Sequence, residues 1–492
     1  MNKKIPSPRV RAANHERPRP KGQHVLYWMT TARRTEYNFA LQHALRWSSD
    51  LGVPLIVLEA LRCDYEWASD RMHQFVLDGM QDNQRTFSHF GVRYLAYIED
   101  RVSAGRGLVA ALSADAALVI TDEFPSFFIP QMIRRAGESL PVRLEVVDGN
   151  GILPLSSASR PYTTAASFRR HVQKVVLDHI TEMPEAEPLV QMDYQGLAAV
   201  PRDVQQRWAL VDSHQEPHSD LADISRLPID HSVSPVQIRG GSGEAKRRLE
   251  RFINEALPDY QTHRNRTDGD GTSRLSAFLH FGHISCHQVV NSVLSSESWG
   301  VGQVSDRVTG SRSGWWGLSE SSESYLDQVI TWRELGYTLC AQRPDDYHLF
   351  ESLPDWAQET LNIHEKDPRP VSYTLEELEG SLTHDPVWNA AQRELVEDGR
   401  IHNYLRMLWG KKILEWSRTP REALQTLIHL NNKYALDGRN PNSWSGIFWT
   451  FGRFDRAWGP ERPIFGKVRY MSSDNTVRKL RLKAYLRQWD PA

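Results

Sequence analysis

The sequence predicts an α/β, Rossmann-like N-terminal domain with a parallel sheet, followed by a large all-α C-terminal domain. The chain has 492 residues, which is more than one hydrophobic core usually holds, so we expect two domains. Short apolar runs alternate with segments of helical periodicity as far as residue 150, which is typical of a parallel sheet covered by helices. From Gly243 onward, apolar residues recur almost entirely at helical spacing.

The strands of the N-terminal domain are predicted from short apolar runs. These runs cover residues 24–30, 54–61, 92–98, 116–124 and 142–150. Residues 36–49 and 71–89, which lie between runs, have the spacing of amphipathic helices. Right-handed crossovers then place the strands in one parallel sheet. No Gly-x-Gly-x-x-Gly follows the first run, so the dinucleotide-binding fingerprint is absent, although the carboxyl ends of the strands can still hold a ligand.

The domain boundaries are predicted from changes in composition. Residues 1–22 are basic and rich in proline, so we expect a disordered arm there. The Rossmann-like domain is assigned to residues 23–185 and the helical domain to residues 246–492. Residues 186–245, rich in Pro, Ser, Asp and Gly without sustained periodicity, are predicted to be a linker between the domains. Within the helical domain, residues 295–323 form a Gly/Ser-rich loop that carries three tryptophans.

Composition places the chain among ordinary globular proteins, with 40% hydrophobic and 24% charged residues. No apolar stretch is long enough to span a bilayer, and the N-terminus lacks the apolar core of a signal peptide. Cys63, Cys286 and Cys340 lie far apart, which excludes a disulfide framework and a four-cysteine metal site made by one chain. We therefore expect a cytoplasmic protein with no membrane partner.

The charge is distributed unevenly along the chain. From Arg400 to Ala492 there are 18 Lys and Arg against 7 Asp and Glu, a net charge of +11. The other residues carry 41 basic and 54 acidic groups, a net charge of −13. Such asymmetry is expected when one region faces a polyanion such as the phosphate backbone of a nucleic acid. A solvated basic face, or a site for cofactor phosphates, is the alternative.

Residues 269–285 are predicted to begin a helix, because a Gly-Asp-Gly turn and the hydroxyls of Thr272 and Ser273 precede an apolar run. Such a helix end can bind an anion, or its amides can simply be capped. His280, His283 and His287 would lie on one face of this helix. No fourth ligand is evident nearby, so we expect core or surface histidines and no metal site.

Aromatic and polar residues of the helical half form two further patterns. Trp409 and Trp416 lie seven residues apart, so they project from one helix face about 10.5 Å apart along its axis. A core stripe explains this spacing, and a redox or base-stacking role is the alternative. Asn431 and Asp437 are embedded among apolar residues. Such polar groups need partners, which a heteroaromatic ring or a helix cap would supply.

Together these motifs resemble the photolyase/cryptochrome family, and specifically the class II cyclobutane pyrimidine dimer photolyases. The segments that carry the resemblance follow the family's order across nearly the whole chain. They are VLYWM at 25–29, TSRLSAFLHFGHIS at 272–285, WREL at 332–335, DPVWNAAQ at 385–392, GRIHNYLRMLWGKKILEW at 399–416, LNNKYALDGRNPN at 430–442 and ERPIFGKVRYM at 461–471.

The resemblance implies a helical domain that binds FAD in a folded conformation, and it assigns roles to individual residues. The residues implied to contact FAD are Tyr260, Thr272, Ser273, Leu275, Ser276, Arg333, Asn431, Asp437 and Asp455, with Asn431 against flavin N5. The residues implied to pass electrons from the surface to the flavin are Trp388, Trp409 and Trp416. The residues implied to line the lesion pocket or to fill the gap in the duplex are Arg264, Asn265, Gln328, Trp332, Met407, Trp449 and Arg469.

The implied function is light-driven repair of ultraviolet-damaged DNA. An electron passes from photoexcited, reduced FADH⁻ to a flipped-out pyrimidine dimer, the cyclobutane ring splits, and the electron returns. An antenna chromophore of the 8-hydroxydeazaflavin type is a further implication for the N-terminal domain, although residues 34–41 and 159–168 follow the antenna pattern loosely. We expect a monomer with no obligate protein partner.

One implied catalytic position departs from the family pattern. Where the family has a glutamate four residues before the tryptophan of WREL, this chain has Gln328. An amide can donate a hydrogen bond to the pyrimidine carbonyls, but more weakly than a protonated carboxyl group. Two alternatives therefore stand beside DNA repair: a photolyase-like flavoenzyme that acts on another substrate, and a cryptochrome-like blue-light sensor. A long C-terminal extension would favour the sensor, and the chain ends soon after the last motif.

Overall fold

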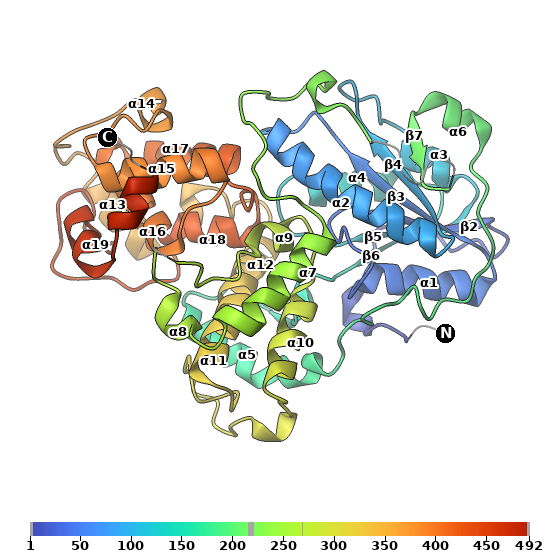
Figure 1. Ribbon diagram of the computed structural model, residues 1–492, viewed down its shortest axis with the longest axis horizontal. Coiled ribbons are helices and arrows are strands. Elements are labelled where there is room, and N and C mark those ends of the chain that lie inside the picture. The colour runs from blue at the N-terminus through green and yellow to red at the C-terminus, as the bar shows by residue number, and fades with distance from the viewer. Residues whose placement is uncertain (1–2, 215–220, 268, 490–492) are drawn as a thin grey trace. The chain divides into compact units, whose positions relative to one another are not determined.

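The computed structural model describes residues 3–214, 221–267 and 269–489 (Figure 1). The chain forms two compact units, each assembled from separate segments. The first unit comprises Met1–Ser157, Val176–Leu249 and Leu275–Ser292, and the second comprises Ala158–Val175, Glu250–Arg274 and Val293–Ala492. The predicted boundaries treat each domain as one continuous stretch, whereas in the structure the chain passes between the units several times.

The first unit is built on a seven-stranded sheet in the order β1-β6-β5-β2-β3-β4-β7. The strands are β1 Val10–Ala12, β2 His24–Met29, β3 Leu55–Leu61, β4 Arg93–Ile98, β5 Ala116–Asp122, β6 Leu144–Val147 and β7 Leu210–Asp212. The five central strands pair in parallel, and the two outer strands pair antiparallel. The five predicted apolar runs are these central strands, which confirms the predicted fold class.

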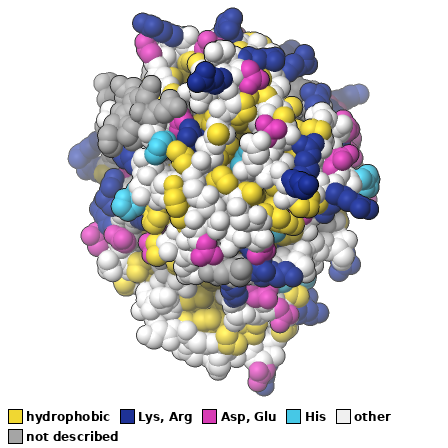
Figure 2. Space-filling model, turned by 90° about the vertical axis from the view of Figure 1, so that its right-hand side faces the viewer, with side chains coloured by type: hydrophobic (Ala, Val, Ile, Leu, Met, Phe, Trp, Pro, Cys, Tyr) yellow, Lys and Arg dark blue, Asp and Glu magenta, His cyan; other side chains and the backbone are white. Residues whose placement is uncertain are grey.

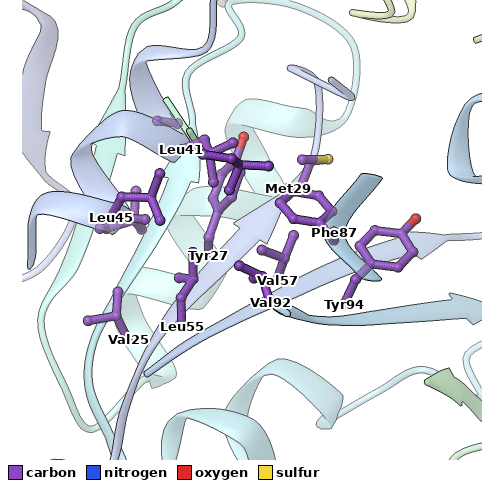
Figure 3. Packing of buried hydrophobic residues seen from close by; sticks show 14 of the residues in the cluster. Val25, Tyr27, Met29, Leu41, Leu45, Leu55, Val57, Phe87, Val92 and Tyr94 are labelled. Atoms are coloured by element: carbon purple, nitrogen blue, oxygen red, sulfur yellow. The ribbon is translucent and has the colours of Figure 1, made fainter. Parts of the chain in front are cut away.

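Alternate residues of the strands pack against helices on opposite faces of the sheet. Val25 and Tyr27 of β2 belong to the core under α1 Phe39–Leu51 and α2 Asp70–His89 (Figure 3). Leu26 and Trp28 belong to the core of the other face. The helices that contribute to this second core are α3 Leu108–Ser113, α4 Ile129–Ser139 and α6 Arg202–Arg207.

The predicted disordered arm is wrong for the described part of residues 1–22. Residues 10–12 form β1, which pairs with β6 at the edge of the sheet. Arg9 is 2% exposed and donates hydrogen bonds to the carbonyl oxygens of Asp148, Gly151 and Ile152, at 3.1, 3.1 and 2.6 Å. These bonds satisfy the buried guanidinium and fasten the segment to the sheet, which a reading of composition alone does not foresee.

The predicted linker also contains part of the sheet. Within residues 186–245 lie α6 and β7, and β7 pairs with β4. Trp208, which precedes β7, is 4% exposed and donates through Nε1 to the carbonyl oxygen of Ala104 at 3.0 Å. These residues therefore belong to the first unit rather than to a connection between units.

The described part of the second unit is built of helices joined by loops, as predicted. Its helices are α8 Tyr260–His263, α11 Glu320–Leu326, α12 Arg333–Gln342, α13 Asp355–Ile363, α14 Leu375–Glu379, α15 Pro386–Asp398, α16 Asn403–Trp416, α17 Pro420–Tyr434, α18 Pro441–Trp449, α19 Ser473–Lys479 and α20 Lys483–Trp489. Four further helices lie wholly or partly in segments of the first unit: α5 Ala165–Ile180, α7 Ser242–Arg251, α9 Ser276–His280 and α10 Cys286–Ser296. Two π-helical segments, Phe252–Ala256 and Asp327–Trp332, interrupt the α-helical pattern.

Two observations bear on membranes and surface charge. In the described ranges, no helix combines the length and the apolar character needed to cross a bilayer. Figure 2 shows one face of the molecule, on which Lys and Arg side chains are scattered among acidic and hydrophobic groups.

Candidate active site

The three tryptophans predicted to carry electrons come together between α15 and α16. Asp385 caps α15 by accepting from the amides of Val387 and Trp388, which fixes where Trp388 enters the core. Trp388 is fully buried, and its Nε1 donates to the carbonyl oxygen of Trp409 at 3.1 Å. Its ring centroid lies 5.4 Å from that of Trp416. A ring contact therefore joins Trp388 and Trp416, and Trp409 accepts the hydrogen bond from Trp388 through its backbone carbonyl.

Trp409 and Trp416 are also buried, at 2% and 3% exposure. Trp409 donates through Nε1 to Oε1 of Gln392 at 2.9 Å, so its indole N–H is satisfied within the core. Lys412 places its ammonium nitrogen 5.6 Å from the centroid of Trp416. All three tryptophans are therefore buried, and Trp388 is the most completely buried, with 0% exposure.

Two residues that sequence reasoning missed extend this aromatic cluster toward solvent. The rings of Tyr373 and His384 lie 5.1 and 5.7 Å from Trp416. The Tyr373 hydroxyl and His384 Nδ1 are hydrogen-bonded; His384 is exposed and Tyr373 is half-buried. Neither residue lies in an apolar or periodic segment, so only the tertiary contact identifies them.

Arg333 and Asn431, two predicted FAD contacts, lie near the start of α18. Arg333 is buried and donates through Nη2 to the hydroxyl of Tyr337 at 3.1 Å, and Asn440, the N-cap of α18, donates to the same hydroxyl at 3.2 Å. Asn431 is 2% exposed and donates through Nδ2 to Oγ of Ser443, in the first turn of α18, at 2.7 Å. The structure thus brings the arginine and the amide to one end of a helix.

Tyr260, Arg264 and Ser273 form a second group. Tyr260 is buried, and its ring packs at right angles to that of Tyr325, 5.2 Å away. The Arg264 guanidinium lies 5.6 Å from the Tyr260 centroid and donates to Oγ of Ser324 at 2.9 Å. Burial raises the pKa of Tyr325, and a hydrogen bond with Ser273 acts against this shift. A predicted DNA contact, Arg264, therefore adjoins Tyr260, a predicted FAD contact, and Ser273 interacts with the same aromatic pair through Tyr325.

The expected long helix after residue 269 is wrong. Thr272 and Ser273 lie in an irregular loop, and α9 begins only at Ser276 and ends at His280, after one turn. Gly282 has a φ of +75°, which ends the helical path before α10 begins. The anion-binding argument for a helix N-terminus therefore does not apply here.

The three histidines accordingly belong to no single helix face. His283 is 1% exposed, and burial lowers its pKa to about 3, so it is a neutral core residue. No group of three or more candidate metal-ligating side chains occurs among the residues that the structure describes.

Gln328 and Trp332 lie in the π-helical segment Asp327–Trp332, and both are half-buried. A π-helical turn carries an extra residue, so it changes which side chains lie above one another. Asp327, the neighbour of Gln328, faces α5. It is 7% exposed and forms a two-bond ion pair with Arg169 of α5, at 2.7 and 3.0 Å.

Trp449 and Arg469, both predicted for the lesion pocket, are close to each other. The Arg469 guanidinium lies 5.7 Å from the centroid of Trp449 and 4.0 Å from that of Trp458. It also forms two hydrogen bonds with Asp455, at 2.7 and 3.1 Å. This ion pair lowers the pKa of Asp455 against the opposing effect of burial. Asp455, predicted as a flavin contact, thus uses both oxygens on Arg469.

The remaining predicted residues are dispersed. Asp437 forms a two-bond ion pair with Arg406 of α16, at 2.8 and 3.2 Å. Leu275 is buried and Ser276 is exposed at the start of α9. Asn265 is exposed and Met407 is half-buried. The roles assigned to all of these residues stay predictions.

The donor set around α17 and α18 fits a ligand with several hydrogen-bonding atoms. The buried Nδ2 of Asn432 has no hydrogen-bond partner within the described ranges. An unpaired buried amide is costly, so a ligand acceptor at this place would remove a penalty. The neighbouring Asn431 amide can both donate and accept, and Arg333 supplies a charged donor. An isoalloxazine ring and phosphates present the complementary groups.

Comparisons of sequence and of fold show which known proteins this chain resembles. It is 32% identical to a deoxyribodipyrimidine photo-lyase from Methanothermobacter thermautotrophicus over 487 residues, 98% of both chains. It is 31% identical to the enzyme of that name from Potorous tridactylus, over 96% of this chain and 82% of that one. Its fold is similar to that of a bacterial class III photolyase from Agrobacterium tumefaciens, with a TM-score of 0.60, 16% identity and coverage of 96% and 87%. A search of protein-family models found no match. The full-length relatives and the fold agree with the motifs described above, and the chain therefore belongs to the photolyase/cryptochrome family.

Proposed function

We propose that this protein is a class II-type photolyase that uses light to repair cyclobutane pyrimidine dimers in DNA. The observation that carries the proposal is the similarity to deoxyribodipyrimidine photo-lyases along the entire chain, at 32% and 31% identity. The buried tryptophan series supports it, because it offers a route by which electrons would reach and reduce a flavin bound in the core.

FAD is the proposed cofactor. Bound reduced FAD supplies, when it absorbs blue light, the electron that splits the dimer. Tyr260, Ser273 and Arg333 are the residues that would hold it, and Asn431 would lie against the reactive edge of its ring. An amide suits that position, because it can donate or accept without a charge penalty. A deazaflavin antenna in the first unit stays a prediction.

The tryptophans provide the electron path in this proposal. Trp388 is buried completely, and Trp416 contacts half-buried Tyr373 and exposed His384. Electrons would enter at this exposed end and move inward through Trp416, Trp388 and Trp409. The ring contact of 5.4 Å between Trp388 and Trp416 is short enough for rapid transfer.

Gln328, Trp332 and Trp449 would receive the flipped dimer. Flipping a distorted lesion costs only a few kcal/mol, and stacking on an indole offsets ~1–3 kcal/mol per base. Gln328 would donate its amide hydrogens to the pyrimidine carbonyls. A neutral amide stabilises the developing negative charge less well than a carboxylic acid, so we expect binding to be retained and splitting to be slower.

The experiment is a repair assay with chemically reduced, FAD-loaded protein under anaerobic blue light. Ultraviolet-irradiated DNA is the substrate, the loss of dimers is measured, and a dark sample is the control. We expect dimers to disappear only in the light, and Gln328→Glu to accelerate the loss. If the reduced protein and the Gln328→Glu variant both leave the dimer content unchanged, the proposal is wrong.

Gln328 also favours a second candidate function. Gln328 in place of a carboxyl group is compatible with a photolyase-like flavoenzyme whose substrate is not a pyrimidine dimer. That candidate gains support if the light-dependent oxidation of reduced flavin is normal while the protein binds irradiated and undamaged DNA equally.

A further inference from the structure

Lys411 of α16 is a fully buried lysine, with a side-chain exposure of 0%. Its neighbour Lys412 pairs with Glu415 at 2.8 Å and lies 3.9 Å from Asp385. Lys411 forms no ion pair with any described residue. Burial of an ammonium group without a carboxylate partner is costly, and here it lowers the pKa of Lys411 to about 7. Such a residue calls for an explanation other than stability.

The contacts of Lys411 all lie at the end of α18. Its ammonium group donates to the carbonyl oxygen of Thr450, the C-cap residue of that helix. A cation is favoured at this place, because the free carbonyls of a helix end carry partial negative charge. The same ammonium nitrogen lies 4.9 Å from the ring centroid of Trp449, in a cation–π contact. Lys411 thus holds both the backbone after Trp449 and the indole itself.

A glycine makes this approach possible. A Cβ atom on Gly410 would lie 2.6 Å from Oγ1 of Thr450, which is closer than real Cβ contacts allow. A side chain at this position would force Thr450 to shift, so the glycine favours the close approach of α16 to the end of α18. The close approach brings the ammonium group of the next residue within reach of Trp449.

Trp449 is half-buried, so part of its ring faces away from the core. Arg469, fixed by Asp455, lies over the same ring. These two groups are also the charged neighbours that act on Lys411: the carboxylate of Asp455 raises its pKa and the guanidinium of Arg469 lowers it. Trp449 is therefore held from within by a lysine and is flanked by an arginine predicted to contact DNA.

We propose that Lys411 is a positioning residue, which fixes the Trp449 indole as the surface on which a flipped pyrimidine dimer stacks and so sets the discrimination between damaged and undamaged DNA. The inference rests on the proposed function and extends it to a residue that does not touch the substrate. Without the Lys411 ammonium group the Trp449 indole would lose its fixed orientation, and this gives the costly buried charge a function.

The test measures two dissociation constants in the dark with FAD-loaded protein. One is for a duplex with a single cyclobutane thymine dimer, and the other is for the same duplex without damage. Discrimination is the dissociation constant for the undamaged duplex divided by that for the damaged duplex. We expect Lys411→Met to lower this ratio by about tenfold or more, which is the scale of one buried cation–π contact. Binding of undamaged DNA should stay unchanged, because phosphate contacts do not involve Trp449. Lys433→Met, which removes a lysine paired with Glu379, is the matched control and should leave the ratio of the two constants unchanged.

A purely structural role predicts a different pattern. In that case Lys411→Met would weaken binding of both duplexes equally and would lower the melting temperature. We expect instead that its melting temperature at pH 6 is not below that of the wild type, because the buried charge is gone. Lys411→Arg keeps the charge and should retain part of the discrimination.

A second measurement needs no neutral variant. The wild-type ratio should fall as the pH rises from about 6 to about 8.5, because Lys411 loses its proton, whereas Asp455 and Arg469 stay charged. The ratio of Lys411→Arg should not change over this range. If Lys411→Met discriminates like the wild type, or if the wild-type ratio is independent of pH, this inference is wrong while the proposed function stands. A wild type that does not prefer the damaged duplex overturns the proposed function and this inference with it.

Discussion

The buried ion pair between Arg169 and Asp327 offers a sharp test of how the segment that carries Gln328 is held. The two side chains are 9% and 7% exposed and share two hydrogen bonds, of 2.7 and 3.0 Å. Arg169 also donates to the carbonyl oxygen of Gly310 at 3.2 Å. The pair therefore connects α5 both to the π-helical segment and to the Gly/Ser-rich loop of residues 295–323.

Asp327→Asn keeps the shape of the side chain but leaves the guanidinium buried without a counter-charge. Removal of one partner of such a pair costs about 3–5 kcal/mol. The second unit has about 240 residues, for which the unfolding entropy is about 0.5 kcal/mol per kelvin. We therefore expect the melting temperature of this unit to fall by about 6–10 °C. Circular dichroism during heating at fixed scan rate measures the change.

Two variants complete the test. Arg169→Met combined with Asp327→Leu removes both charges and should restore most of the lost stability, because well-packed apolar residues replace a buried pair at little cost. Arg170→Met removes an exposed neighbour, so it should leave the melting temperature unchanged. A fall of less than about 2 °C for Asp327→Asn would refute the reasoning, as would a double variant less stable than the single one.

Three further predictions concern electron transfer, DNA binding and stability. Trp416→Phe should slow the photoreduction of oxidised flavin at least tenfold, which the absorbance of the flavin measures. The same variant, reduced chemically beforehand, should repair at the wild-type rate, and slow repair by it would contradict the proposed path. The affinity for undamaged DNA should fall steeply as salt rises, because backbone contacts release counterions, and a flat response would count against the basic segment 400–492 as the DNA-binding region. Burial lowers the pKa of Lys411 from 10.5 to about 7, so between these pH values the unfolded chain binds more protons than the folded protein. The unfolding free energy of the wild type, relative to that of Lys411→Met, should therefore rise with pH over this range by up to about 5 kcal/mol. Denaturant titrations of both proteins at several pH values measure this difference.

The sheet shows what the sequence can predict and what it cannot. The central strands are apolar on both faces, so their runs are visible without any structure. The edge strands β1 and β7 have three residues each, and they lie in segments rich in charged or turn-forming residues. Their pairing depends on tertiary contacts such as the hydrogen bonds of Arg9, and a buried arginine is indistinguishable in sequence from an exposed one.

The candidate site shows the same limit. The seven-residue spacing of Trp409 and Trp416 predicts one helix face, but the position of Trp388 beside Trp416 came only from the family resemblance. Lys411 and Lys412 are adjacent and chemically identical, yet one is fully buried and the other forms two ion pairs. A pair of lysines in a helix is ordinarily a solvated face, so only the packing of α16 against α18 distinguishes them.

Two buried charged groups of this protein, Asp122 and Lys411, differ in how well their surroundings satisfy them. In the first unit, the buried carboxylate of Asp122 accepts from the Tyr27 hydroxyl and from the backbone amides of three successive residues at the end of β2. Every donor there is satisfied, so the group stabilises a turn at little cost. Lys411 has one backbone acceptor and an aromatic ring, and a methionine would fill its place more cheaply. Lys411 lies beside Trp449, a residue that the family resemblance assigns to substrate, and the proposed discrimination test examines whether this placement has a function.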